Sequence, residues 1–367
     1  MASETGNPRL ERNPPSLLGF LTAYVPEELF HAAGFTPVFI FHAPDDRGHA
    51  RAHLPSFTCW VAGSALDQAL AGDLDHLAGM ALAKTCDSTQ GLADLWQPNV
   101  PHVPLFHFGM PLRLDSSSAR AYLLAELESL RARIQTVAGR SISDETLQES
   151  IRLYNRTRAL VRRLYARAAS PAGVPPGGEN RGSAPALYRL VRAAFQMPKD
   201  AYNDHVSQLL GRPSTFPNDG GRKRRVLLVG PALGDPVLFD VLDQSGARVV
   251  GDLMDLGERY FAVDAAEDSH PLEALADRLL ALVPTPTKHH PQRTREAHLL
   301  ALVRQRRADG VIFARQKFCE PHGFDYAQMA HALDESAVPN LLVELEQASQ
   351  TGQVRTRVEA FVEMITG

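Results

Sequence analysis

The stretch His76-Leu-Ala-Gly-Met-Ala-Leu-Ala83, followed by Lys84-Thr-Cys-Asp-Ser88, decides the fold class of this sequence. Its first part is an apolar run with the length of a buried strand, and a helix is expected from about Thr89. The same order of strand, loop and helix recurs at Gly310-Val-Ile-Phe-Ala314 and the residues after it. Such alternation predicts an α/β fold with doubly wound parallel sheets.

Further elements are expected on both sides of this stretch. In the first lobe they are a helix from Leu17 to Gly34, a strand over Thr36–Phe41, a helix over Ser64–Leu70 and a short strand over Val103–Phe106. Helices starting at Ser117 and Asp144 follow, then a Pro- and Gly-rich loop over Ala169–Pro185 and two shorter helices up to about Leu210. The second lobe is expected to hold strands over Arg225–Gly230, Arg248–Gly251, Gly310–Ala314 and Asn340–Glu344, with a last helix from Gln353.

The length of 367 residues exceeds what one hydrophobic core usually serves. We therefore expect two doubly wound parallel-sheet lobes with a helical insertion between them. The predicted divisions are residues 1–116, with Cys59 and Cys86, residues 117–221, which are helical, and residues 222–367, with Cys319.

Charge and composition exclude several partners. The formal net charge of −4 offers no electrostatic reason to bind nucleic acid, and the basic run Arg222–Arg225 is interpreted as a solvated strand entry. No stretch approaches the ~18 apolar residues of a membrane span, and the polar N-terminus predicts no signal peptide. A cytoplasmic protein is expected.

The three cysteines, Cys59, Cys86 and Cys319, show no CxxC spacing, so a zinc ribbon or a ferredoxin-type run is excluded. Each stands in a loop before an expected helix, and ligands of parallel sheets gather where such loops meet. Three thiolates would hold an iron–sulfur cluster and leave one iron open, whereas three unrelated buried thiols fit the spacing equally well.

Several motifs resemble those of the 2-hydroxyacyl-CoA dehydratase / benzoyl-CoA reductase family. They are Tyr24-Val-Pro-Glu-Glu-Leu29, Ala32-Ala-Gly-Phe-Thr-Pro37, Phe57-Thr-Cys59, Thr85-Cys-Asp87, Phe318-Cys-Glu-Pro-His322, Val338-Pro-Asn-Leu-Leu-Val-Glu344 and Gly352-Gln-Val-Arg-Thr-Arg357. The resemblance runs in the same order from about Leu17 to Met364.

The resemblance implies a [4Fe–4S] cluster on Cys59, Cys86 and Cys319. It implies an ATP-activated lyase subunit that dehydrates a 2-hydroxyacyl-CoA thioester by one-electron chemistry. The alternatives are benzoyl-CoA reductase-type reduction of an aromatic ring, a homodimeric reductase of a small molecule without CoA, and a non-catalytic electron-relay or scaffold subunit whose sister chain binds the substrate. The expected partners are a sister subunit or a second copy, a separate ATP-dependent iron–sulfur activator, and an acyl-CoA or aromatic-CoA substrate.

Two further residues are candidates for proton transfer. Glu27 would bring a carboxylate near the substrate or favour the helix N-terminus through its dipole. His322 would hydrogen-bond the cluster or shuttle a proton, or stand in a solvated loop. Ser88 is expected to cap the helix after Cys86. Gly230-Pro-Ala-Leu-Gly234 follows a strand but lacks both phosphate-loop patterns, so nucleotide binding is not expected there.

Overall fold

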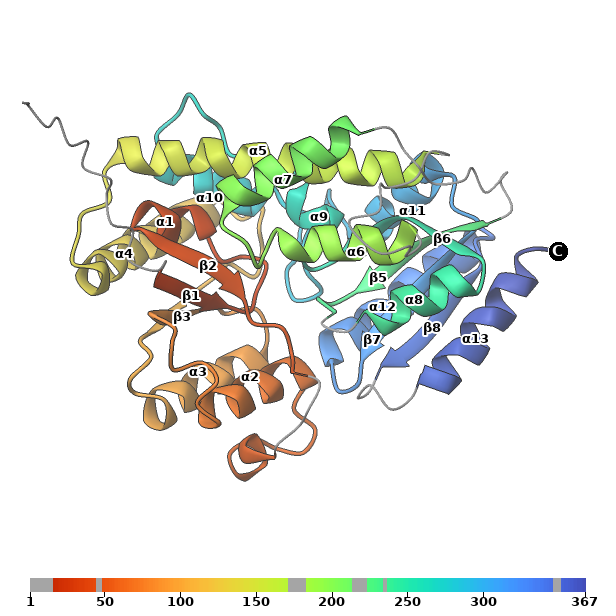
Figure 1. Cartoon of the computed structure of the whole chain (residues 1–367), viewed down its shortest axis with the longest axis horizontal. Coiled ribbons are helices and arrows are strands. Elements are labelled where there is room, and N and C mark those ends of the chain that lie inside the picture. Colours follow the sequence, from red (N-terminus) through yellow and green to blue (C-terminus); the bar gives the residue numbers. More distant parts are fainter. Residues whose placement is uncertain (1–15, 44–47, 171–182, 213–222, 234–235, 346–350) are drawn as a thin grey trace, which may run out of the picture.

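The computed structural model describes residues 16–43, 48–170, 183–212, 223–233, 236–345 and 351–367. Two separate four-stranded sheets form the centres of two lobes (Figure 1). Their strand orders are β2-β1-β3-β4 and β6-β5-β7-β8, and every pairing within them is parallel. The predicted α/β class with two parallel-sheet lobes is confirmed.

The first sheet is built from four short strands. They are β1 (Ser16–Phe20), β2 (Phe35–Phe39), β3 (Gly79–Ala83) and β4 (Leu105–Phe108). Every residue of β3 is buried, which explains why it is apolar throughout instead of alternating. Helices α1 (Glu27–Ala32), α2 (Trp60–Leu70) and α3 (Asp87–Asn99) follow β1, β2 and β3, with a short 3₁₀ helix at His49–Ala52.

The single helix predicted from Leu17 to Gly34 is wrong. Ser16–Phe20 instead forms β1, which pairs with both β2 and β3 and so lies inside the sheet. A short apolar run fits a buried strand and a buried helix equally well, and pairing with distant strands decides between them. Only Glu27–Ala32 is helical, and Gly34 follows it with φ +89°, the left-handed conformation expected of a glycine after a helix.

Four helices connect the two sheets. They are α4 (Ala119–Ala138), α5 (Asp144–Ala169), α6 (Ser183–Ala193) and α7 (Lys199–Gly211). The Ser143 hydroxyl caps α5 by accepting from the Thr146 amide at 3.2 Å. Helix α5 runs along both lobes and contacts α1 of the first lobe and β6 of the second (Figure 1). Most of the predicted Pro/Gly loop, residues 171–182, lies outside the described residues.

The second sheet contains β5 (Arg224–Gly230), β6 (Ala247–Met254), β7 (Gly310–Gln316) and β8 (Asn340–Leu345). Its helices are α8 (Val237–Gln244), α9 (Glu258–Phe261), α10 (Pro271–Ala281), α11 (Arg295–Arg306), α12 (Glu320–Glu335) and α13 (Thr351–Met364). Arg224 opens β5, in agreement with the predicted strand entry. Among the described residues, no helix has the length and apolar character needed to cross a membrane.

Buried ion pairs join α1 to the connecting helices. Glu28 is fully buried and pairs with Arg158 of α5, while Glu27 is fully buried and pairs with Lys199 of α7 at 2.9 Å. Charges removed from water in this way are tolerated only in fixed pairs. The two ion pairs therefore hold α1 in place against α5 and α7. Because α1 follows β1, they also hold the end of that strand.

Candidate functional site

All three cysteines lie at the first turn of a helix. Cys59 is the N-cap of α2, Cys86 of α3 and Cys319 of α12. None is in a disulfide, and each is partly buried. Phe318, just before Cys319, has a φ of +64°, a left-handed conformation that non-glycine residues rarely adopt. The positive ends of the three helix dipoles lie at the sulfurs and reduce the cost of burying a thiolate there.

One cavity of about 100 Å³ is lined by all three thiols. It lies where the carboxyl ends of the strands of both sheets approach each other. Its walls are Leu21, Thr22, Ala23, Phe39, Cys59, Val61, Ala62, Thr85, Cys86, Thr89, Pro231, Ala232, Asp255, Leu256, Thr285, Pro286, Thr287, Cys319, Pro321 and His322. The cavity therefore sits at the place where doubly wound sheets bind ligands.

The thiols are electrostatically close to one another. Burial raises the pKa of Cys59, and the nearby Cys86 raises it further. Burial also raises the pKa of Cys319 to about 12, with contributions from Cys59 and Cys86 of the same sign. An isolated thiolate is thus disfavoured here, and three thiolates together require a positively charged ligand between them.

Polar groups at the helix starts partly offset the effect of burial on the thiols. The backbone of Ala62 and the side chain of Ser88 lower the pKa of Cys59, and the backbone of His322 lowers the pKa of Cys319. The prediction that Ser88 caps α3 is wrong. Cys86 and Thr89 form the capping box of this helix, so the Ser88 hydroxyl is available to the neighbouring thiol.

His322 lies in the cavity wall beside Cys319. Its Nδ1 is 3.3 Å from the Cys319 Sγ, and its Nε2 is 3.9 Å from an oxygen of Asp255. Burial lowers the pKa of His322, so the neutral ring is favoured. The ring links a cavity sulfur to a cavity carboxylate.

Glu27 is not among the residues that line the cavity. Its carboxylate is fully buried, accepts from Lys199 Nζ at 2.9 Å and accepts from the Tyr260 hydroxyl. The structure therefore brings His322 and the three cysteines together and leaves Glu27 apart from them.

The sequence did not indicate several wall segments, among them Asp255 after β6, the residues after β5 and those between α10 and α11. Pro231 and Ala232 follow β5 and belong to the stretch Gly230–Gly234, which lacks the phosphate-loop patterns. The position of this stretch directly after a strand could have indicated that it borders a site. Thr285, Pro286 and Thr287 lie between α10 and α11, where no strand precedes them and no local pattern marked them.

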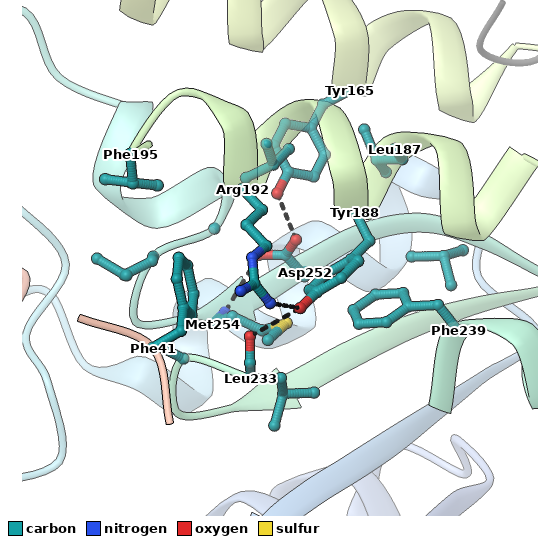
Figure 2. Close-up of a pocket in the computed structure, with 15 residues that line it drawn as sticks. Phe41, Tyr165, Leu187, Tyr188, Arg192, Phe195, Leu233, Phe239, Asp252 and Met254 are labelled. Atoms are coloured by element: carbon teal, nitrogen blue, oxygen red, sulfur yellow. Dashed lines mark hydrogen bonds between the residues drawn. The ribbon is translucent and has the colours of Figure 1, made fainter. Parts of the chain in front are cut away.

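A second, apolar cavity of about 40 Å³ adjoins the first, because Ala232 and Leu256 line both. Figure 2 shows the aromatic side chains of Phe41, Tyr188, Phe195 and Phe239 around it. The guanidinium of Arg192 stacks 4.0 Å from the centre of the Phe41 ring and donates to the Tyr188 hydroxyl at 2.9 Å.

The donor set suits an iron–sulfur cluster. No three His, Cys, Asp or Glu side chains in the described parts of the chain could jointly hold a single metal ion. Each thiolate of a cubane binds a different iron, so its ligands stand farther apart than those of one ion. Three free thiols that line one cavity supply the type of ligand that such a cluster needs.

Comparison with known proteins identifies the family of the chain. The family model described as "2-hydroxyglutaryl-CoA dehydratase, D-component" matches residues 22–365. The chain is 25% identical to the (R)-phenyllactyl-CoA dehydratase beta subunit of Clostridium sporogenes, over 97% of this chain and 93% of that protein. It is 27% identical to the lactoyl-CoA dehydratase subunit beta of Anaerotignum propionicum, over 95% and 91%. It is 26% identical to one of the subunits of the benzoyl-CoA reductase of Thauera aromatica, over 95% and 90%. The chain belongs to the 2-hydroxyglutaryl-CoA dehydratase D-component family.

Proposed function

We propose that this chain binds one [4Fe–4S] cluster through Cys59, Cys86 and Cys319. The observation that carries the proposal is that the only three cysteines of the chain, far apart in sequence, begin three helices around one cavity. Three thiolates leave one iron without a protein ligand, in the way that a catalytic zinc keeps an open position. The site then offers a substrate oxygen a place to bind.

The residues around the thiols have separate tasks in this proposal. When bound, the cluster supplies single electrons at low potential. The cavity walls exclude bulk water, since most of them are apolar. His322 is positioned to donate or accept a proton, because its ring lies between Cys319 and Asp255. Glu27 holds α1 in place through Lys199 and takes no direct part.

The proposed reaction is the dehydration of a 2-hydroxyacyl-CoA thioester. The relatives named as phenyllactyl-CoA and lactoyl-CoA dehydratase subunits support this choice. The aromatic cavity beside the thiols supports an apolar acyl group, since its walls offer ring faces and its polar groups bond to one another. Reduction of an aromatic CoA thioester is the second candidate, and the benzoyl-CoA reductase relative favours it.

We further propose that the chain works with a sister subunit or a second copy. The relatives are all named as subunits of enzymes, which supports an assembly. Phe57, Phe318 and Phe324 are 65%, 47% and 79% exposed and flank Cys59 and Cys319. Large exposed apolar side chains are typical of contact surfaces. A separate ATP-dependent activator would supply the electrons, and the reducing cytoplasm would keep the thiols free.

The cluster is tested by replacing each cysteine with serine. Wild-type protein purified without oxygen should be brown and contain about four irons and four sulfides per chain. Each variant should lose most of the iron while keeping the circular dichroism of the fold. A colourless wild-type protein after anaerobic reconstitution, with its fold intact, would contradict the proposal.

The two candidate reactions are separated by the ATP used per product. Dehydration is redox-neutral, so the electron returns after each turnover and a few ATP molecules support many products. Ring reduction consumes electrons, so ATP use rises in proportion to product. Chain, partner and activator are mixed with the thioester, and phosphate and product are measured together over hundreds of turnovers.

A further inference from the structure

Lys288 is a buried ammonium without an acidic partner among the described residues. It is 3% exposed, and its Nζ donates to the carbonyls of Lys84 at 3.2 Å and Met110 at 3.1 Å. Both acceptors are neutral, and no Asp or Glu in the described parts of the chain is paired with it. Burial of a charge costs several kcal/mol unless an opposite charge compensates it. A missing counter-ion is therefore expected close to this side chain.

The side chain lies close to one of the three cysteines, Cys86. Lys84, whose carbonyl accepts from Lys288, stands two residues before Cys86, and Thr287 lines the cavity. Burial lowers the pKa of Lys288 to about 8, and the neighbouring Cys86 opposes that change. The acidic group that acts on Lys288 is thus a cysteine of the site.

The segment that carries Lys288 is held from both lobes. The Thr285 amide donates to the Tyr24 hydroxyl at 3.1 Å, and Arg295 donates to the carbonyl of Thr285 at 2.9 Å. The His289 amide donates to the carbonyl of Leu112 at 2.8 Å. Anchors on both sides keep the ammonium from moving out to solvent.

We propose, on the basis of the cluster proposed above, that the positive charge of Lys288 balances part of the negative charge of the cluster and its three thiolates. Lys288 acts through the electric field of its charge, since it does not line the cavity. Each electron added makes the cluster more negative, and a fixed positive charge in a medium of low dielectric favours that addition. Lys288 therefore raises the reduction potential of the cluster.

The alternative role is purely structural, since the same hydrogen bonds tie two loops together. Lys288→Gln keeps a donor for the carbonyls and removes the charge, and Lys288→Met keeps only the apolar stem. Lys288→Arg keeps the charge. Lys84→Gln is the matched control, because Lys84 is a lysine only two residues from Cys86 whose side chain is exposed to solvent.

The experiment is a dye-mediated redox titration of the whole reconstituted chain, followed by EPR, with iron and sulfide measured in each sample. We expect Lys288→Gln and Lys288→Met to lower the ratio of reduced to oxidised cluster at least tenfold at a given potential, about 59 mV for one electron. Lys288→Arg and Lys84→Gln should change the reduction potential of the cluster by much less than this.

The outcomes separate this inference from the proposed function. A neutral variant with full iron content and the wild-type potential overturns the role of Lys288 and leaves the cluster untouched. Should one neutral variant fail to fold, the other is judged by the same criterion. A wild-type chain that takes up no iron and sulfide overturns the cluster and the role of Lys288 together.

Discussion

The cavity holds one histidine whose two ring nitrogens face different groups, the sulfur of Cys319 and the carboxylate of Asp255. Glutamine in place of His322 keeps a polar side chain but cannot exchange a proton near neutral pH. We expect His322→Gln to lower kcat about 100-fold, which is typical for loss of a general acid or base. The iron content should stay unchanged.

His331→Gln is the matched control, because His331 belongs to the same helix α12 and its side chain is 75% exposed. It should leave kcat within a factor of two. Steady-state kinetics with iron analysis on the same samples decide the question. An unchanged kcat in His322→Gln would show that the ring contributes only to the packing of α12 and not to proton transfer.

At the scale of elements, the packing of helix α1 against α5 and α7 depends on buried ion pairs. Glu27→Gln leaves the Lys199 ammonium, 4% exposed, without its carboxylate. Loss of one partner of a buried pair costs about 3–5 kcal/mol of unfolding free energy. Asp204→Asn breaks the exposed pair of Asp204 and Arg156 on α7 and α5 and should cost less than about 1 kcal/mol. Urea unfolding of both variants tests this.

The Glu27 experiment also tests its suggested catalytic role. If Glu27 only supports the fold, the folded fraction of Glu27→Gln should turn over at the wild-type rate. A stable variant with a strongly reduced kcat would show that the carboxylate takes part in proton transfer.

The strands beside the cavity touch backbone to backbone at Gly230, the last residue of β5. A Cβ there would lie 2.2 Å from the carbonyl oxygen of Ala314 in β7. Gly230→Ala should push β5 from β7 and lower the unfolding free energy by about 3 kcal/mol. Gly63→Ala in α2, where no atom lies within 4 Å, should stabilise the protein by about 0.5–1 kcal/mol. Thermal unfolding of the two variants should show shifts of opposite sign.

At the scale of the whole molecule, the exposed phenylalanines that stand near Cys59 and Cys319 in the sequence predict a contact with another chain. Replacement of Phe57 and Phe324 by serine should weaken association at least tenfold and leave the fold intact, because both rings are mostly exposed. Met364→Ser on α13 is the control, since Met364 is 60% exposed and lies outside the cavity. Sedimentation velocity with the co-expressed partner measures the change.

A chain that remains monomeric at micromolar concentration, alone and with its partner, would contradict this prediction. A stable contact usually buries about 1,600 Å² in total. The rings of Phe57, Phe318 and Phe324 supply only part of that area, so the contact must include further surface of the chain.

By itself, the sequence determined most of the elements and the positions of the three cysteines directly before helices. Long helices such as α5 and buried runs such as β3 follow from local periodicity, which the chain carries in its order of residues. Tertiary structure alone decided that Ser16–Phe20 is a central strand, that Glu27 is buried and that Lys288 donates to the carbonyl of Lys84. The reason is physical. These outcomes depend on contacts between residues as many as 261 positions apart, and no local pattern of polar and apolar residues encodes such partners.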